Sequence, residues 1–235
     1  MLRAACSRAA GYRWYLDRVA ATVEAARASS DSERVVLVGH SAGGWLARAF
    51  SGDERYGAPP GCAAPHPGLA AIVSLGSPHP PPPPGVFDVT RGALSWLDQR
   101  LPGAHFARQG VAYISVAGRA VRANAAAEAR GPRYAASSYG AQLGEAALEN
   151  AEVVGDAVVP LSCALLPGST QLILDGVWHS MSRVGTFDEA SGLVWYGSDA
   201  VVDHWLAPLV DALSGAGDGL SAGSGGMSGS TASDN

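Results

Sequence analysis

The sequence predicts an α/β fold, in which a mainly parallel sheet is flanked by helices. Short apolar runs of strand length alternate along the chain with longer segments of helical periodicity, which is the order that such a sheet requires. The apolar runs are nearly continuous, as expected for strands that are buried on both faces. Polar residues with catalytic chemistry follow several of these runs, at the strand ends where α/β sheets bind ligands. The predicted strands are 35–39, 71–76, 111–117 and 171–176.

The helices are predicted from the spacing of apolar residues between these strands. In the first helix, 11–28, four residues recur on one face: Leu16, Val19, Ala20 and Val23. A second helix, 43–51, follows the first strand directly. Further helices are expected at 90–99, 122–130, 141–149 and 199–213. The last helix carries six apolar residues that we expect to pack on the sheet: Val201, Val202, Trp205, Leu206, Leu209 and Val210.

The turn between the first strand and the second helix carries a candidate nucleophile. Gly39 to Gly43 fit the pattern G-x-S-x-G between a buried strand and a helix, which is the context of a nucleophile elbow. A β-carbon at Gly39 or Gly43 is expected to collide with a neighbouring strand or helix. Ser41 then stands at the apex of the turn, at a helix N-terminus that favours negative charge. The alternative is a glycine-rich turn in which Ser41 only caps the helix.

A serine hydroxyl needs a base to accept its proton, and the chain has six histidines. In enzymes with this elbow, the acid and then the base follow the serine in the sequence. Chain order argues against His66, His79 and His105, which precede the predicted acid, Asp156. His40 is expected to point away from Ser41, and His204 is expected to face solvent on a helix. His179 follows the strand-like segment 171–177 almost directly, and is therefore the predicted base.

The predicted acid is Asp156, which lies 23 residues before His179 in the segment between the third and fourth strands. A carboxylate there can accept the imidazole N–H and stabilise the imidazolium that forms during attack. Asp156 could instead close a turn after Gly155, a frequent use of aspartate. Glu152 on the same loop is the reserve candidate. Asp175 is less favoured because it would have to fold back on the base from its own strand.

Four segments together resemble one enzyme family: Gly39–Trp45, Leu75–His79, Gly155–Pro160 and the segment around His179. They are similar to α/β-hydrolase lipases, and among these to the plant and algal branch that resembles GPI inositol-deacylases. The resemblance covers most of residues 10–210. It implies ester hydrolysis through an acyl-enzyme, with Ser41 as nucleophile, His179 as base and Asp156 as orienting acid.

One feature departs from that family. An α/β-hydrolase places several strands, and a loop with an oxyanion-hole donor, before the nucleophile strand. Only 34 residues precede Val35, and they contain no second predicted strand. We therefore interpret the chain as N-terminally truncated, with the first strands missing and Val35–Val38 left as a sheet edge. The oxyanion hole would keep one donor, the backbone N–H of Ala42, and losing the other costs on the order of 100- to 1,000-fold in turnover.

The motifs predict a serine hydrolase of the lipase or carboxylesterase type that cleaves an apolar ester. The alternative is a non-catalytic, α/β-hydrolase-like binding scaffold, which the missing first strands favour. No metal or cofactor is expected, because no Cys/His cluster has ligand spacing and Gly39–Gly44 lacks the Lys-Ser/Thr of a phosphate-binding loop.

Composition limits the partners and the compartment. Of the 235 residues, 47% are hydrophobic and 16% charged, which is typical of one globular domain. A net charge of −5 argues against nucleic acid, and no apolar stretch is long enough to span a membrane. We expect a small-molecule or lipid ester as substrate, with at most weak contact to a membrane surface. Three widely spaced cysteines indicate a soluble protein in a reducing compartment, with cytoplasm or plastid as candidates: Cys6, Cys62 and Cys163.

The remaining segments are predicted from their composition. Residues 1–213 are assigned to the α/β-hydrolase domain, and the Gly/Ser-rich residues 214–235 to a disordered tail. Pro78–Pro84 is a proline run that could wall the substrate cleft or bind an SH3- or WW-type partner, and a stiff connector is favoured. Residues 118–150 form an insertion of the kind that makes a lid. Six residues are candidates for the acyl cleft: Phe87, Trp96, Leu97, Phe106, Trp178 and Met181.

Overall fold

A four-stranded parallel sheet forms the centre of the protein. The computed structural model describes residues 12–128, 130–150, 152–181 and 192–221. The strands are β1 (Val35–His40), β2 (Leu69–Leu75), β3 (Ala112–Arg119) and β6 (Thr170–Asp175), in the order β1-β2-β3-β6 with every neighbouring pair parallel. The prediction of an α/β protein with a mainly parallel sheet is therefore confirmed, and each strand lies within two residues of its predicted position.

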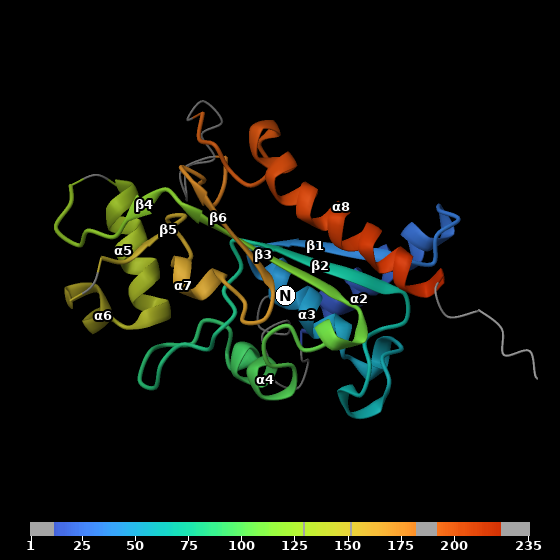
Figure 1. Cartoon of the computed structure of the whole chain (residues 1–235). Helices are drawn as coiled ribbons and strands as arrows, with labels where there is room; N and C mark the ends of the chain where they lie inside the picture. The colour runs from blue at the N-terminus through green and yellow to red at the C-terminus, as the bar shows by residue number, and fades with distance from the viewer. Residues whose placement is uncertain (1–11, 129, 151, 182–191, 222–235) are drawn as a thin grey trace, which may run out of the picture.

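Helices cover both faces of this sheet (Figure 1). One face packs against α2 (Arg13–Ala28), α3 (Ala42–Ser51) and α4 (Ala93–Arg100), and its core includes Ile72 and Tyr113. The other face packs against α8 (Asp199–Ser221), with Val73 and Val116 in its core. The short helix α7 (Leu161–Ala164) contacts β3. Three 3₁₀ turns complete this part of the chain: Glu54–Tyr56, Pro60–Cys62 and Ala107–Gln109.

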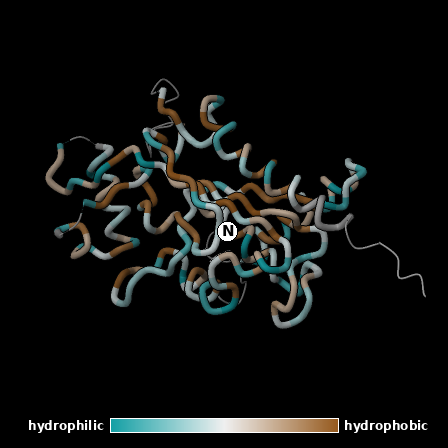
Figure 2. Tube along the Cα trace, in the orientation of Figure 1, coloured by the Kyte–Doolittle hydropathy of each residue, from teal (hydrophilic) through white to brown (hydrophobic). Residues whose placement is uncertain are grey.

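The two central strands are buried as their apolar runs predict. Every residue of β2 is buried, and β3 is buried over all but its two terminal residues. Figure 2 shows the hydrophobic colour running along the sheet. The outer strands β1 and β6 are less covered, and the Val38 side chain is 49% exposed. Among the described residues β1 is thus an edge strand, as the sequence predicts.

In the segment 118–150, which is the predicted lid, the helices lie at other positions than the sequence predicts. The helix predicted at 122–130 is wrong: β4 (Val121–Arg122) pairs antiparallel with β5 (Val154–Gly155), and α5 begins only at Arg130. Long-range pairing therefore overrides the helix propensity of the alanines in this stretch. The predicted helix 141–149 is divided between α5 (Arg130–Leu143) and α6 (Glu145–Asn150). The break falls at Gly144, whose φ of 85° ends a right-handed helix.

The C-terminal helix is longer than predicted and is partly buried. α8 continues to Ser221, so residues 214–221 of the predicted tail are helical, while 222–235 lie outside the described residues. Val201 and Leu209 are buried against the sheet, and Trp205 packs beside them. Leu206 and Val210 are exposed, so fewer residues of this helix pack on the sheet than the sequence predicts.

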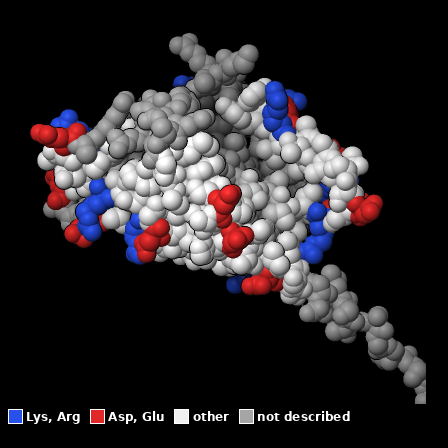
Figure 3. Space-filling model, turned by 90° about the horizontal axis from the view of Figure 1, so that it is seen from above, with Lys and Arg blue, Asp and Glu red and all other residues white. Residues whose placement is uncertain are grey.

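Three findings bear on the expected partners and compartment. No helix in the described part of the chain is long and apolar enough to cross a membrane. On the face seen in Figure 3, acidic and basic side chains are interspersed and do not gather by sign. Cys62 and Cys163 are both free and buried, and Cys6 lies outside the described residues.

Candidate active site

Ser41 occupies a strained turn between β1 and α3. Its φ of 55° and ψ of −124° lie in a region that residues with a β-carbon rarely adopt. The backbone N–H of Ser41 donates to the Leu75 carbonyl at 2.9 Å, which fixes the turn to the end of β2. The hydroxyl makes no capping hydrogen bond to α3. The simpler interpretation, in which the Ser41 hydroxyl caps the helix, is therefore wrong.

The glycines of the turn have unequal roles. A β-carbon built at Gly39 would lie 2.3 Å from the Gly43 carbonyl carbon and 2.4 Å from the Gly44 nitrogen. At Gly43 nothing lies within 4 Å, so the collision predicted there is absent. The second tight position is Gly44, where a β-carbon would lie 2.1 Å from Ser77 Oγ on the chain leaving β2. Gly39 and Gly44 are therefore the glycines that the close packing of this turn requires. Gly43, in contrast, faces open space.

Replacing Gly39 by alanine is expected to lower the free energy of unfolding by about 3 kcal/mol, because the new methyl group overlaps the backbone at the start of α3. Gly43→Ala is the matched control in the same turn. It adds a methyl group in open space within a helix, and is expected to raise stability by up to about 1 kcal/mol. Urea unfolding followed by circular dichroism measures both changes. Similar losses in the two variants would contradict this geometry.

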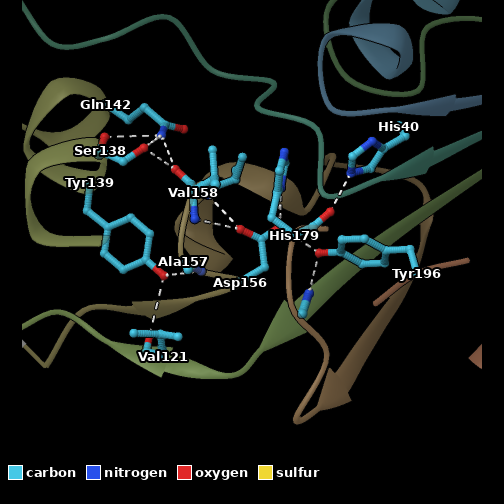
Figure 4. Close-up of polar contacts among 12 residues, drawn as sticks. His40, Val121, Ser138, Tyr139, Gln142, Asp156, Ala157, Val158, His179 and Tyr196 are labelled. Atoms are coloured by element: carbon cyan, nitrogen blue, oxygen red, sulfur yellow. Dashed lines mark hydrogen bonds and ion pairs between the residues drawn. The ribbon is translucent and has the colours of Figure 1, made fainter. Parts of the chain in front are cut away.

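Asp156 is held rigidly at the end of β5. Its side chain is 1% exposed, and its Oδ1 accepts the backbone N–H groups of Val158 at 3.0 Å and Val159 at 2.7 Å. The turn includes Ala157 at φ 86°, a positive value that is rare for alanine. The Tyr139 hydroxyl on α5 supports this turn by accepting the Ala157 N–H at 3.1 Å. These contacts leave the second carboxylate oxygen directed away from the turn (Figure 4).

His179 lies on the chain that follows β6 and contacts Asp156 twice. Its Nδ1 is 2.8 Å from Asp156 Oδ2, and its backbone N–H donates to the Asp156 carbonyl at 2.9 Å. The His179 side chain is 9% exposed and that of Asp156 is 1% exposed, so this pair is shielded from water. A neutral histidine that donates Nδ1–H to a carboxylate leaves Nε2 free to take a proton. The structure therefore brings the predicted acid and base together.

His40 links this pair to the serine turn. Its Nε2 lies 2.7 Å from the His179 carbonyl oxygen and its ring centroid 4.7 Å from that of His179. Since His40 directly precedes Ser41, a hydrogen bond joins the Ser41 turn to the loop that carries His179 (Figure 4). Burial, and then the proximity of His179, lower the pKa of His40 below its ordinary value. A neutral His40 adds no positive charge beside the base.

The other candidate acids lie away from His179. Glu152 forms an exposed ion pair with Arg122. Asp175 pairs with Arg119 across β3 and β6, and both side chains are exposed. Neither carboxylate is therefore available to orient the base.

The other four histidines make contacts away from the Asp156–His179 pair or are exposed to solvent. His66 packs its ring on Phe50, and His105 packs on Phe106. His204 is exposed on α8, as predicted. His79 is buried, within hydrogen-bond distance of Ser74 and Arg48.

His79 and Arg48 of α3 form a buried polar contact. Burial, and then the Arg48 charge, lower the pKa of His79 to about 3, so the imidazole is neutral. Burial lowers the pKa of Arg48 to about 10, which leaves it charged at neutral pH. Its guanidinium donates to the Leu101 carbonyl at 2.7 Å. These contacts tie α3 to the chain after β2 and to the end of α4.

A cavity of about 420 Å³ opens beside the serine turn and is lined by Ser41 and Ala42. Ala42 is the first residue of α3, and the N–H groups of a first helical turn have no partner within their helix. The residue predicted to supply the oxyanion donor therefore lines the cavity. Much of the remaining wall is apolar and comes from α3, α4 and the acid loop: Trp45, Leu46, Leu94 and Val159.

Two predicted segments contribute to this cavity. Pro78, Pro80 and Pro82 of the proline run lie on its wall, so the run is more than a connector. In the predicted lid, Ser138 and Gln142 of α5 also line it. None of the six predicted cleft residues lines this cavity. Among them, Leu97 and Phe106 are buried in the core, and Phe87 is 77% exposed. Periodicity alone does not reveal which apolar residues of α3 and α4 face a cavity.

Sequence reasoning did not identify Tyr196. This tyrosine is fully buried, and its hydroxyl donates to Asp156 Oδ2 at 2.8 Å. It lies 40 residues beyond the acid, in an aromatic segment that carries no motif. Nothing in the local sequence indicates this contact.

The comparisons leave the family open. A scan of the chain against models of known protein families finds no match, and a search of the curated proteins also finds none. The residues of the site are therefore the basis for its function.

Proposed function

We propose that this protein is a serine hydrolase of the lipase or carboxylesterase type. The observation that carries the proposal is the buried Asp156–His179 pair, which His40 ties to the strained turn of Ser41. A base that a carboxylate orients can take the proton of a serine hydroxyl, which activates this hydroxyl for attack. An α/β-hydrolase fold with a GPI inositol-deacylase-like relationship is part of this proposal, and is suggested by the sequence resemblance alone.

The proposed reaction has two halves. Ser41 Oγ attacks the ester carbonyl carbon while His179 Nε2 takes the hydroxyl proton, and the Ala42 N–H stabilises the oxyanion. His179 then gives this proton to the departing alcohol, which leaves an acyl group on Ser41. Water attacks the acyl-enzyme with His179 again as base. The carboxylic acid is released, and the proton returns to Ser41. Throughout, Asp156 orients the imidazole and stabilises its charged form.

The cavity supports an apolar acyl group as the part of the substrate that lies beside Ser41. A volume of about 420 Å³ is within the usual range of small-molecule sites. Its indole, aliphatic and proline side chains offer mainly dispersion and hydrophobic contacts. A negatively charged acyl group would lose its hydration there without gaining a paired charge, because the charged residue on the cavity wall is the acid Asp88. An uncharged ester with an apolar acyl chain fits this environment.

Covalent labelling with a fluorophosphonate tests the proposal, because this probe reacts with serine hydroxyls that a neighbouring base activates. We expect the wild-type chain to be labelled and the Ser41→Ala variant to remain unlabelled. Ser138→Ala is the matched control: Ser138 lines the same cavity, but its hydroxyl donates to the Val158 carbonyl at 2.5 Å. This variant should be labelled at the wild-type rate.

Two results would overturn the proposal. One is labelling that persists in Ser41→Ala. The other is a wild-type chain that circular dichroism shows to be folded but that the probe does not label. The second result would favour a binding function for the cavity.

A further inference from the structure

Tyr196 and His179 share one oxygen atom of Asp156. The Tyr196 hydroxyl donates to Oδ2 at 2.8 Å, and His179 Nδ1 lies 2.8 Å from the same atom. The Tyr196 hydroxyl also accepts the Gly118 N–H at 2.7 Å, which fixes its own orientation. Within the described residues, four hydrogen bonds therefore surround the carboxylate, two at each oxygen, when the two backbone N–H groups at Oδ1 are included. Figure 4 shows His179 and Tyr196 converging on Asp156.

The backbone leaves room for this contact. A β-carbon at Gly76 would lie 2.5 Å from Asp156 Oδ2 and 2.8 Å from the Tyr196 hydroxyl oxygen. A β-carbon at Gly118 would lie 3.0 Å from the Asp156 β-carbon and 2.2 Å from the Val177 carbonyl oxygen. Glycines at the ends of β2 and β3 thus allow a buried tyrosine, a carboxylate and an imidazole to meet.

Two donors on one oxygen compete for the same negative charge. The Tyr196 hydroxyl stabilises the carboxylate, and each such bond weakens the attraction that remains for the imidazolium. The two backbone bonds at Oδ1 are part of the fold. The bond from Tyr196 is made by a side chain alone, so its strength can be altered without changing the turn.

We propose that Tyr196 is a positioning residue that acts through Asp156 and sets how strongly the carboxylate holds a proton on His179. The inference rests on the proposed function, in which His179 must take and release a proton at each half-reaction. Without Tyr196 the carboxylate would attract the imidazolium more strongly. The base would then release its proton less readily to the leaving alcohol.

Two further titratable groups lie near Asp156 and His179, and their positions differ from that of Tyr196. In the described part of the chain, His40 from β1 faces His179, and Tyr139 from α5 lies near Asp156. Burial, and then the charge of Asp156, raise the pKa of Tyr196 well above its ordinary value, so its hydroxyl stays protonated. Burial raises the pKa of Tyr139 in the same way. Of these two tyrosines, only Tyr196 hydrogen-bonds to the Asp156 side chain.

The test compares Tyr196→Phe with Tyr139→Phe. Each variant removes one buried hydroxyl and leaves one backbone N–H without its partner, Gly118 in one case and Ala157 in the other. The His179 Cε1–H resonance, identified by its loss in His179→Asn, is followed by NMR as pH is varied. We expect the His179 midpoint to rise by about half a unit to one unit in Tyr196→Phe, the scale of one weakened charged hydrogen bond. In Tyr139→Phe it should stay at the wild-type value, and the acid limb of kcat/KM should follow the resonance in both.

A second substitution keeps the test decisive if Tyr196→Phe does not fold. Difluorotyrosine at position 196 keeps the ring and strengthens the hydroxyl as a donor, and should therefore lower the His179 midpoint. An unchanged midpoint, or equal shifts from positions 196 and 139, would overturn the inference. The titration needs no substrate. A shift specific to position 196 in a protein without ester turnover would support the role of Tyr196 and refute the proposed function alone.

Discussion

Ser41→Ala is expected to lower ester turnover by about a million-fold, the loss seen when a triad nucleophile is removed. The acyl group has no other acceptor in the proposed mechanism, because the base and the oxyanion donor only assist the serine. Folding should be unaffected, since the Ser41 side chain makes no cap to α3. Hydrolysis of p-nitrophenyl butyrate by the wild type and the variant measures the ratio.

Ser138→Ala provides the control for this substitution as well. It removes a hydroxyl from the same cavity wall but not from the acid–base pair. Turnover within about twofold of the wild type is expected. If the Ser41→Ala variant retained a tenth of wild-type turnover, Ser41 would be excluded as the nucleophile.

Asp156→Asn is expected to reduce kcat by roughly 10,000-fold. The amide keeps the size of the side chain, but it can present an N–H to His179 Nδ1 where the carboxylate presents an oxygen. The imidazole then takes the tautomer with its proton on Nε2, which cannot accept the serine proton. The ratio of kcat values for a p-nitrophenyl ester measures the loss, and thermal unfolding shows whether the variant is folded.

Glu152→Gln is the matched control for the acid. Glu152 belongs to the same segment of sequence, but its carboxylate is exposed and paired with Arg122. An exposed ion pair contributes little to stability, so both folding and turnover should change little. A large loss in Glu152→Gln together with an active Asp156→Asn would show that the acid is assigned to the wrong residue.

The sheet and the contact between Asp156 and His179 could be predicted because their signals are local. Each of the four strands contains a short apolar run, and the Ser41 turn is fixed by small residues next to one another in the sequence. Chain order and the position of the residues at strand ends indicate His179 and Asp156. The structure joins those two residues at 2.8 Å, although they are 23 positions apart.

The remaining features depend on contacts between distant segments. Tyr196 reaches Asp156 from beyond the base, and His40 meets His179 across 139 positions. No periodicity or motif in the sequence indicates either of these contacts. The helix predicted at 122–130 failed for the same reason, because pairing with β5 outweighs the propensity of the alanines. Gly44 was missed as a close-packing position because its neighbour, Ser77, comes from another strand end.

The central claim is that an ester is cleaved through an acyl group on Ser41, and trapping this intermediate tests it most directly. The protein is mixed with p-nitrophenyl butyrate, quenched in acid during turnover and digested with trypsin. Cleavage after Arg34 and Arg48 places Ser41 in a peptide, 35–48, that contains no other serine. We predict a butyryl group on this peptide in the wild type and none in Ser41→Ala. Turnover with an unmodified peptide, or with the acyl group on another residue, would contradict the proposed function.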